Sequence, residues 1–188
     1  MNNPYLEDIM HRIEKVSEDV EAQFGTLSVS QLNWKPSPEE WSIGQCLHHL
    51  VTTNETYFPQ LIAIISGTKK RSIWERLPFL PGFWGRMLVK SMTPEPKTKM
   101  KAPSVFRPSQ SNITADIVSV FKTHNEELLS YFQSLDAVDH QKVIITSPAA
   151  YFVTYSLFNA IRILTNHEER HYQQAMRALE RLRVEEQD

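Results

Sequence analysis

The stretch TYSLFNAIRILTNHEERHYQQAMRALERLRVE, residues 154–185, decides the fold. It contains neither glycine nor proline, so nothing in it interrupts a helix. Small and apolar residues recur along it at helical spacing: Ala160, Leu164, Ala178 and Leu182. We expect one long amphipathic helix, roughly from Thr154 to Glu185, that buries this stripe against other helices.

A second helix is predicted near the N-terminus. Between Tyr5 and Phe24 apolar residues recur mostly at spacings of three and four: Leu6, Ile9, Met10, Ile13, Val16, Val20 and Phe24. The helix is expected to end near Gly25. Residues 28–40 then read as a loop, because the prolines at 36 and 38 favour extended backbone before them.

The next helix has a well-marked beginning. Ser42 is placed as the N-cap, and Gln45 three residues later completes a capping box. Trp41 directly before the cap is positioned for a hydrophobic staple. The apolar pattern continues to Gly67, but Pro59 predicts a kink or a break inside it.

The middle of the chain is less regular. Ile73 to Met92 predicts one or two short helices, and residues 94–108 read as a basic, solvated connector. A further long helix is expected from Asn112 to near Asp136, before a short β-branched stretch at residues 143–145. Four long helices predict an all-α fold. We expect one domain over residues 1–188, a four-helix bundle with a long crossover connection between its second and third helices.

Composition excludes several classes of protein. No apolar run approaches the roughly 20 residues of a membrane span, and the N-terminal residues lack the apolar region of a signal peptide. A net charge of −2 disfavours nucleic-acid binding, and the sequence holds no glycine-rich phosphate-binding motif. A single cysteine, Cys46, fits a reducing compartment. We therefore expect a cytoplasmic protein with no nucleic-acid or membrane partner.

The motif HEERH, residues 167–171, carries the most chemistry. Residues four apart project from one helix face, so His167 and His171 can reach the same metal ion. Both lie on the apolar side of the helix, where two unpaired imidazoles are costly, so a metal is favoured over a hydrogen-bonded structural pair. The motif also matches the HExxH pattern of zinc proteases, with Glu168 as general base. That interpretation is disfavoured because the helical tail offers no third ligand within reach.

A third ligand is more readily drawn from another helix of a bundle. His48 and His49 lie in the second turn of the Ser42 helix, both near the edge of its apolar stripe, so periodicity does not choose between them. Cys46 lies one turn before His49, but it also fits the apolar stripe, which favours a small buried hydrophobe over a thiolate ligand.

Four segments resemble one known family in its order: LNWKP (32–36), WSIGQCLHHL (41–50), KAPSVFRPS (101–109) and NHEERHYQQ (166–174). The family is the DinB-like, or YfiT-like, four-helix-bundle proteins. In its pattern the ligand histidine of the second helix precedes a leucine, which selects His49. The resemblance therefore implies a divalent metal, commonly nickel or zinc, held by three histidines in a protein that is often a homodimer.

The resemblance also frames the expected function. Characterised relatives include transferases and isomerases that depend on bacillithiol, mycothiol or glutathione, and others are described as metal-dependent hydrolases. We expect an enzyme in which metal on His49, His167 and His171 activates a thiol or water toward a small electrophilic substrate. Glu168 is the candidate catalytic residue for proton handling, with Tyr172 beside it. The alternative is a non-catalytic metal-binding or stress-related bundle, in which the metal stabilises the fold.

Overall fold

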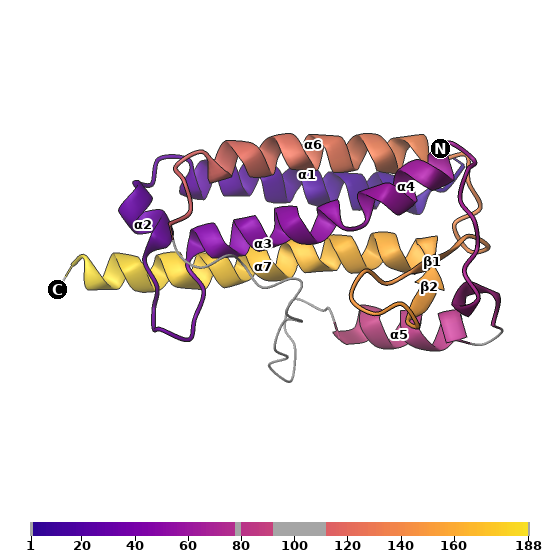
Figure 1. Ribbon diagram of the computed structural model, residues 1–188. Helices are drawn as coiled ribbons and strands as arrows, with labels where there is room; N and C mark the ends of the chain where they lie inside the picture. The colour runs from indigo at the N-terminus through magenta and orange to yellow at the C-terminus, as the bar shows by residue number, and fades with distance from the viewer. Residues whose placement is uncertain (1, 78–79, 92–111, 188) are drawn as a thin grey trace.

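The computed structural model describes residues 2–77, 80–91 and 112–187. These residues are mostly helical, which confirms the predicted all-α class. The four long helices are α1 (Tyr5–Phe24), α3 (Ile43–Glu55), α6 (Ile117–Ser134) and α7 (Leu157–Glu185). They run alongside one another in Figure 1, with α6 beside α1 and α3 beside α7; α1 also contacts α7, and α3 contacts α6.

Shorter elements connect these helices. They are α2 (Val29–Asn33), α4 (Phe58–Ile65), the 3₁₀ helix η1 (Trp74–Arg76), α5 (Leu80–Ser91), β1 (Ile144–Thr146) and β2 (Thr154–Ser156). The two strands form an antiparallel pair, and α5 lies against β2 and the start of α7 (Figure 1). The predicted short helices between residues 73 and 92 are thus η1 and α5. The predicted basic connector, residues 94–108, lies outside the described residues.

The boundaries of α3 follow the sequence prediction. The Ser42 hydroxyl accepts a hydrogen bond from the backbone N–H of Gln45, and the Gln45 side chain accepts one from the N–H of Ser42, both at 3.1 Å. The predicted break also occurs, since α3 ends at Glu55 and α4 begins at Phe58. Pro59 falls in the first turn of α4, where a missing backbone N–H leaves no hydrogen bond unmade.

The predicted loop at 28–40 is wrong over its first part, because residues 29–33 form α2. Ser28 and Gln31 make a second capping box there, the same pattern that marks Ser42. The predicted start of the third long helix at Asn112 is also wrong. Asn112 has a positive φ of 89°, and the Asn33 side chain bonds both backbone groups of Ile113 at 2.8 Å, so the helix begins only at Ile117.

The last helix begins at Leu157, three residues later than predicted. Residues 154–156 instead pair with residues 144–146, with Tyr155 opposite Ile145. Ser156 then caps α7 by accepting a hydrogen bond from the N–H of Asn159. The β-branched stretch at residues 143–145 largely coincides with β1. Pairing with β1 holds residues 154–156 in an extended conformation, so they do not join the helix.

The core divides into two apolar halves along the helix axes. One half draws on the start of α1 and α7 and the end of α6; its members include Ile13, Leu128, Phe132, Ala160 and Leu164. The other draws on the end of α1, on α3, on the start of α6 and on the second half of α7; its members include Val20, Leu47, Leu50, Phe121 and Leu179. Between the halves lies a polar belt, to which α3, α6 and α7 contribute buried polar side chains, among them Asn54, Asn125, Glu168 and the histidines of α3 and α7.

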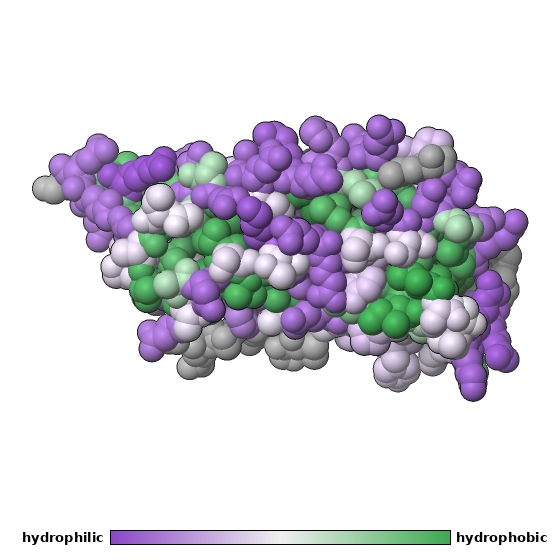
Figure 2. Space-filling view, turned by 90° about the horizontal axis from the view of Figure 1, so that it is seen from above, coloured by the Kyte–Doolittle hydropathy of each residue, from purple (hydrophilic) through white to green (hydrophobic). Residues whose placement is uncertain are grey.

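The outer surface is mixed in character. The face seen in Figure 2 is dominated by hydrophilic side chains, with hydrophobic ones showing between them. Within the described residues, no helix is both long enough and apolar enough to cross a membrane.

Candidate metal centre

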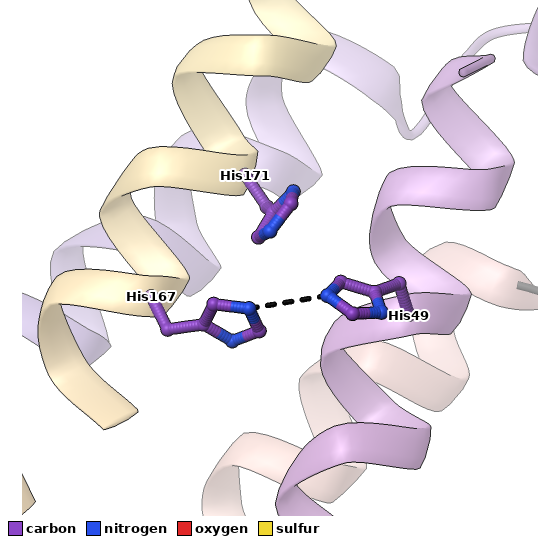
Figure 3. A group of neighbouring side chains, drawn as sticks. All are labelled: His49, His167 and His171. Carbon is purple, nitrogen blue, oxygen red and sulfur yellow. Dashed lines mark hydrogen bonds between the residues drawn. The ribbon is translucent and has the colours of Figure 1, made fainter. Parts of the chain in front are cut away.

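Three histidines meet inside the polar belt. His49 projects from α3, while His167 and His171 project from successive turns of α7, so the rings face one another across the gap between the two helices (Figure 3). One ring nitrogen from each lies within 4.8 Å of the others, and the Nε2 atoms of His49 and His167 are 3.1 Å apart. All three side chains are buried. Among the described residues this is the one group of three or more His, Cys, Asp or Glu side chains with metal-binding geometry.

Burial disfavours the protonated form of the two α7 histidines. Desolvation lowers the pKa of His167 and of His171 well below the ordinary value, and the neighbouring imidazoles and Arg170 lower it further. The Nδ1 atoms of His167 and His171 are buried without a hydrogen-bond partner. Neutral imidazoles are the form that binds metal, so the same burial that disfavours protonation prepares the cluster as a ligand set.

Trp41 and Thr53 surround His49 and His171. The Trp41 ring stacks on His171 with a centroid distance of 5.4 Å and an interplanar angle of 17°, and it contacts His49 edge-on at 4.8 Å. The Thr53 hydroxyl lies 3.4 Å from Nδ1 of His49, one helical turn away. Sequence reasoning gave Trp41 only a role in helix capping and did not single out Thr53. Their spacing could have pointed to both residues, since Trp41 lies two helical turns before His49 and Thr53 lies four residues after His49.

Glu168 points into the polar belt, outside the histidine cluster. Its Oε1 accepts a hydrogen bond from the Asn54 amide at 2.6 Å and its Oε2 accepts one from Asn125 at 3.2 Å. Asn125 also donates to the hydroxyl of Ser17 at 2.9 Å, so the network joins α7 to α3, α6 and α1. Full burial raises the pKa of Glu168 to about 7, although the two amide donors act in the opposite direction.

The other candidates lie elsewhere. His48 is adjacent to the cluster in sequence but is not part of it, and its side chain is half-buried. Cys46 is fully buried in the apolar half of the core beside α3, and burial raises the pKa of its thiol, which fits the predicted role as a small hydrophobe. Tyr172 packs toward α1, with its ring 6.1 Å from that of Phe24.

The sequence from α1 to the second half of α7 matches one family. The model of the DinB superfamily aligns with residues 12–175, a span that includes all three clustered histidines. The chain belongs to the DinB superfamily. It is also similar to the uncharacterised protein YuaE of Bacillus subtilis (strain 168), with 27% identity over 164 residues that cover 83% of this chain and 88% of YuaE. No solved structure matches it.

In this DinB superfamily chain, the three histidines lie on two helices, and different local interactions set where each helix begins. The capping box at Ser42 sets where α3 begins and hence the height of His49. The cap at Ser156 and the strand pair before it set where α7 begins, and His167 and His171 follow on one face. The hydrogen bond from Asn54 to Glu168 ties the two helices together next to the cluster. The arrangement offers three buried imidazole nitrogens as ligand atoms from rigid elements.

Proposed function

We propose that His49, His167 and His171 hold one divalent metal ion, zinc or nickel. The observation that carries the proposal is the convergence of three buried imidazoles whose ligand atoms lie within 4.8 Å of one another. Two nitrogens on one tetrahedral zinc ion lie ~3.3 Å apart, from bond lengths of about 2.05 Å. The 3.1 Å between the Nε2 atoms of His49 and His167 is close to that separation. Two ring nitrogens of the cluster, Nδ1 of His167 and Nδ1 of His171, are buried without a hydrogen-bond partner, which is costly, and ligation of a metal ion would help to offset this cost.

We further propose that the site is catalytic, with a small electrophilic substrate and a thiol or water as nucleophile. A divalent metal held by three histidines keeps coordination positions open and lowers the pKa of water or of a thiol there. The chain's own contribution is to hold three imidazoles buried and fixed on α3 and α7. Trp41 stacks on His171 and covers the cluster on one side, which limits entry of water.

For Glu168 we propose positioning of the ligand helices in addition to the predicted proton handling. Both carboxylate oxygens are held by amides from α3 and α6, which supports a role in fixing α7 relative to α3. The pKa of about 7 would also let this carboxyl exchange a proton near neutral pH. A catalytic role requires a proton path to the cluster, whereas a positioning role does not.

Other expectations remain part of the proposal. The packing of α1, α3, α6 and α7, with η1 and α5 between α4 and α6, supports a four-helix bundle with a crossover connection between its second and third helices. Family resemblance supports one domain over residues 1–188, a homodimer and a cytoplasmic setting.

The experiment that tests catalysis compares two adjacent histidines. Protein loaded with zinc or nickel is screened with bacillithiol, mycothiol and glutathione against haloarene and epoxide electrophiles, and with activated esters for hydrolysis. We expect turnover in the wild type and in His48→Ala, and a loss of at least about a hundredfold in His49→Ala. His48 is the matched control because it is the neighbouring residue on the same helix but lies outside the cluster.

One outcome would favour the alternative function. If the protein binds one metal per chain but turns over none of these substrates, the centre serves stability and the protein is a metal-binding bundle. Equal turnover in His48→Ala and His49→Ala would contradict a catalytic role for the cluster.

A further inference from the structure

Exposed apolar side chains gather at one end of the molecule, away from the histidines. Twelve large hydrophobic side chains are exposed among the described residues. Seven of them come from η1 and its flanks, from α5 and from the turn between β1 and β2: Ile73, Trp74, Leu77, Phe83, Met87, Tyr151 and Phe152. We call these seven residues the aromatic patch. Single exposed hydrophobic residues are common on proteins, but a concentration of this kind indicates a binding surface.

The aromatic rings of the patch contact one another across its segments. Ring centroids of Trp74 lie 5.9 Å from Tyr151 and 6.4 Å from Phe152. The half-buried ring of Trp84 continues the contact, 6.3 Å from Phe152 and 5.2 Å from Phe83. Three separate segments of the chain therefore present one surface of aromatic rings. Phe83 and Tyr151 are the most exposed of these rings, at 56% and 70%.

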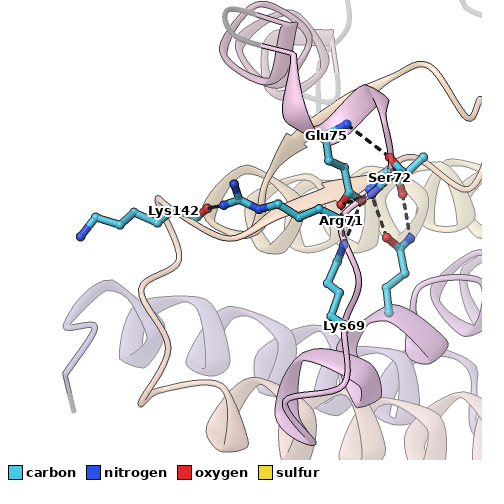
Figure 4. Close-up of polar contacts among 7 residues, drawn as sticks. Lys69, Arg71, Ser72, Glu75 and Lys142 are labelled. Atoms are coloured by element: carbon cyan, nitrogen blue, oxygen red, sulfur yellow. Dashed lines mark hydrogen bonds and ion pairs between the residues drawn. The ribbon is translucent and has the colours of Figure 1, made fainter.

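A buried ion pair holds the patch to the rest of the fold. Lys69 donates to both carboxylate oxygens of Glu75 at 2.9 and 2.8 Å (Figure 4). The Thr146 hydroxyl of β1 donates to the same carboxylate at 2.8 Å. The Glu75 carboxylate also accepts from the N–H of Ser72, and Arg71 donates to the backbone carbonyl of Lys142. The segment that carries Trp74 is thus fixed to the strand pair, and the patch is a preformed surface.

Charge is strongly segregated toward this end. The segments that build the patch, residues 69–91 and 140–156, contain seven Lys and Arg and one acidic residue, Glu75. Two of the seven are paired, Lys69 with Glu75 and Lys142 with Asp139, which directly precedes the second segment; the other five are Lys70, Arg71, Arg76, Arg86 and Lys90. The rest of the chain contains thirteen Lys and Arg and twenty-one Asp and Glu. Because Glu75 is buried and bound by Lys69, its charge does not offset the exposed basic residues Arg76 and Lys90 beside the patch.

We infer that the aromatic patch docks the protein on the surface of an anionic lipid bilayer. Trp, Tyr and Phe rings mixed with Arg and Lys are the composition that favours the headgroup region, where rings insert and cations meet anionic lipids. A second copy of the chain is disfavoured as the occupant, because two equally basic surfaces repel each other. The inference departs from the expectation of no membrane partner, which rested on the absence of an apolar run long enough to span a bilayer. It is independent of the metal centre.

The test measures co-sedimentation with vesicles. The full chain is mixed with vesicles of phosphatidylcholine alone or with 30% phosphatidylglycerol. We expect binding to the anionic vesicles, weakened at least about fivefold between 50 and 500 mM salt and absent with phosphatidylcholine alone. The variant Phe83→Ser/Tyr151→Ser should bind at least about tenfold less. Arg76→Gln/Lys90→Gln should weaken binding less, and only at low salt.

Matched controls lie at the opposite end of the chain. Val184→Ser removes a side chain that is 61% exposed on α7, and Arg183→Gln removes an exposed charge beside it; both should bind as the wild type does. Far-ultraviolet circular dichroism confirms that each variant is folded. The inference is overturned if the wild type fails to bind anionic vesicles or if Val184→Ser and Phe83→Ser/Tyr151→Ser bind equally. It is also overturned if the wild type is a dimer in solution that Phe83→Ser/Tyr151→Ser converts to a monomer.

Discussion

The ion pair of Lys69 and Glu75 predicts an unequal response to removal of its two partners. The two side chains differ in their access to water: 13% of Lys69 is exposed but only 2% of Glu75. Lys69→Met leaves a buried carboxylate with only the Thr146 hydroxyl and the Ser72 N–H as donors. Removal of one partner from a buried pair costs about 3–5 kcal/mol, and we expect Lys69→Met to fall in that range.

Glu75→Gln should be milder. The Lys69 ammonium that remains is close to solvent and can turn toward water, and the new amide oxygen still accepts from Thr146. We expect a loss of about 1–3 kcal/mol in the free energy of unfolding. The double variant Lys69→Met/Glu75→Gln carries no buried charge, so it should recover at least about 1 kcal/mol relative to Lys69→Met alone.

The assay is equilibrium unfolding in urea at pH 7, followed by tryptophan fluorescence. Lys142→Met is the matched control, because Lys142 pairs with Asp139 at 3.0 Å on the exposed surface and its loss should change stability by less than about 0.5 kcal/mol. If Lys69→Met is as mild as Lys142→Met, or milder than Glu75→Gln, the burial argument is wrong.

Three further predictions concern the core. Burial lowers the pKa of His124 to about 4, so the unfolded chain binds more protons between pH 4 and 6.5, and the free energy of unfolding decreases by up to about 3 kcal/mol as the pH is lowered through this range. Urea unfolding of His124→Phe at pH 4.5 and 7.5 should show a smaller difference than the wild type, and an unchanged difference would refute this. Glu168→Leu leaves two buried amides without their acceptor and should lose roughly 2–4 kcal/mol, whereas Glu168→Gln keeps an acceptor and should lose at least about 1 kcal/mol less by the same measurement. At Gly85 an added Cβ would lie 2.3 Å from the Asn159 side chain, so Gly85→Val should lower the free energy of unfolding by about 1–3 kcal/mol. At Gly82 the atom nearest to an added Cβ is 3.7 Å away, so Gly82→Ala should be close to neutral. Similar melting temperatures of the two variants would refute the close approach of α5 to α7.

Much of the architecture was accessible from local sequence patterns. The period of apolar residues identified α1, α3 and α7, and the capping box at Ser42 gave the start of α3 to the residue. These features depend on interactions between residues a few positions apart. The same logic applied to Ser28 and Gln31 would have predicted α2, so that omission was avoidable.

The errors at the other helix starts have a different cause. The start of α6 depends on Asn33, which lies eighty positions before Ile113 in the chain. The Asn33 side-chain amide forms hydrogen bonds with both the backbone N–H and the C=O of Ile113. The start of α7 depends on pairing of residues 154–156 with residues 144–146. Neither partner is visible in the local pattern, because both interactions require the folded chain.

The candidate site divides in the same way. The spacing of His167 and His171 predicted two side chains on one face of α7, but periodicity left His48 and His49 equivalent, and only family resemblance separated them. The structure brings His49 to the α7 histidines and leaves His48 outside. The placement of Glu168 among amides from α3 and α6 could not be predicted, since the neighbours of a buried carboxylate are set by helix packing.

The central claim is that α3 and α7 share one metal ion. Metal content is measured by mass spectrometry on protein purified without a nickel column and then incubated with zinc or nickel, with excess metal removed. We predict about one ion per chain in the wild type and in His48→Ala, and less than about a tenth of that in His49→Ala and in His167→Ala. Wild-type protein without metal after both incubations, or His49→Ala that retains a full equivalent, would contradict the shared site.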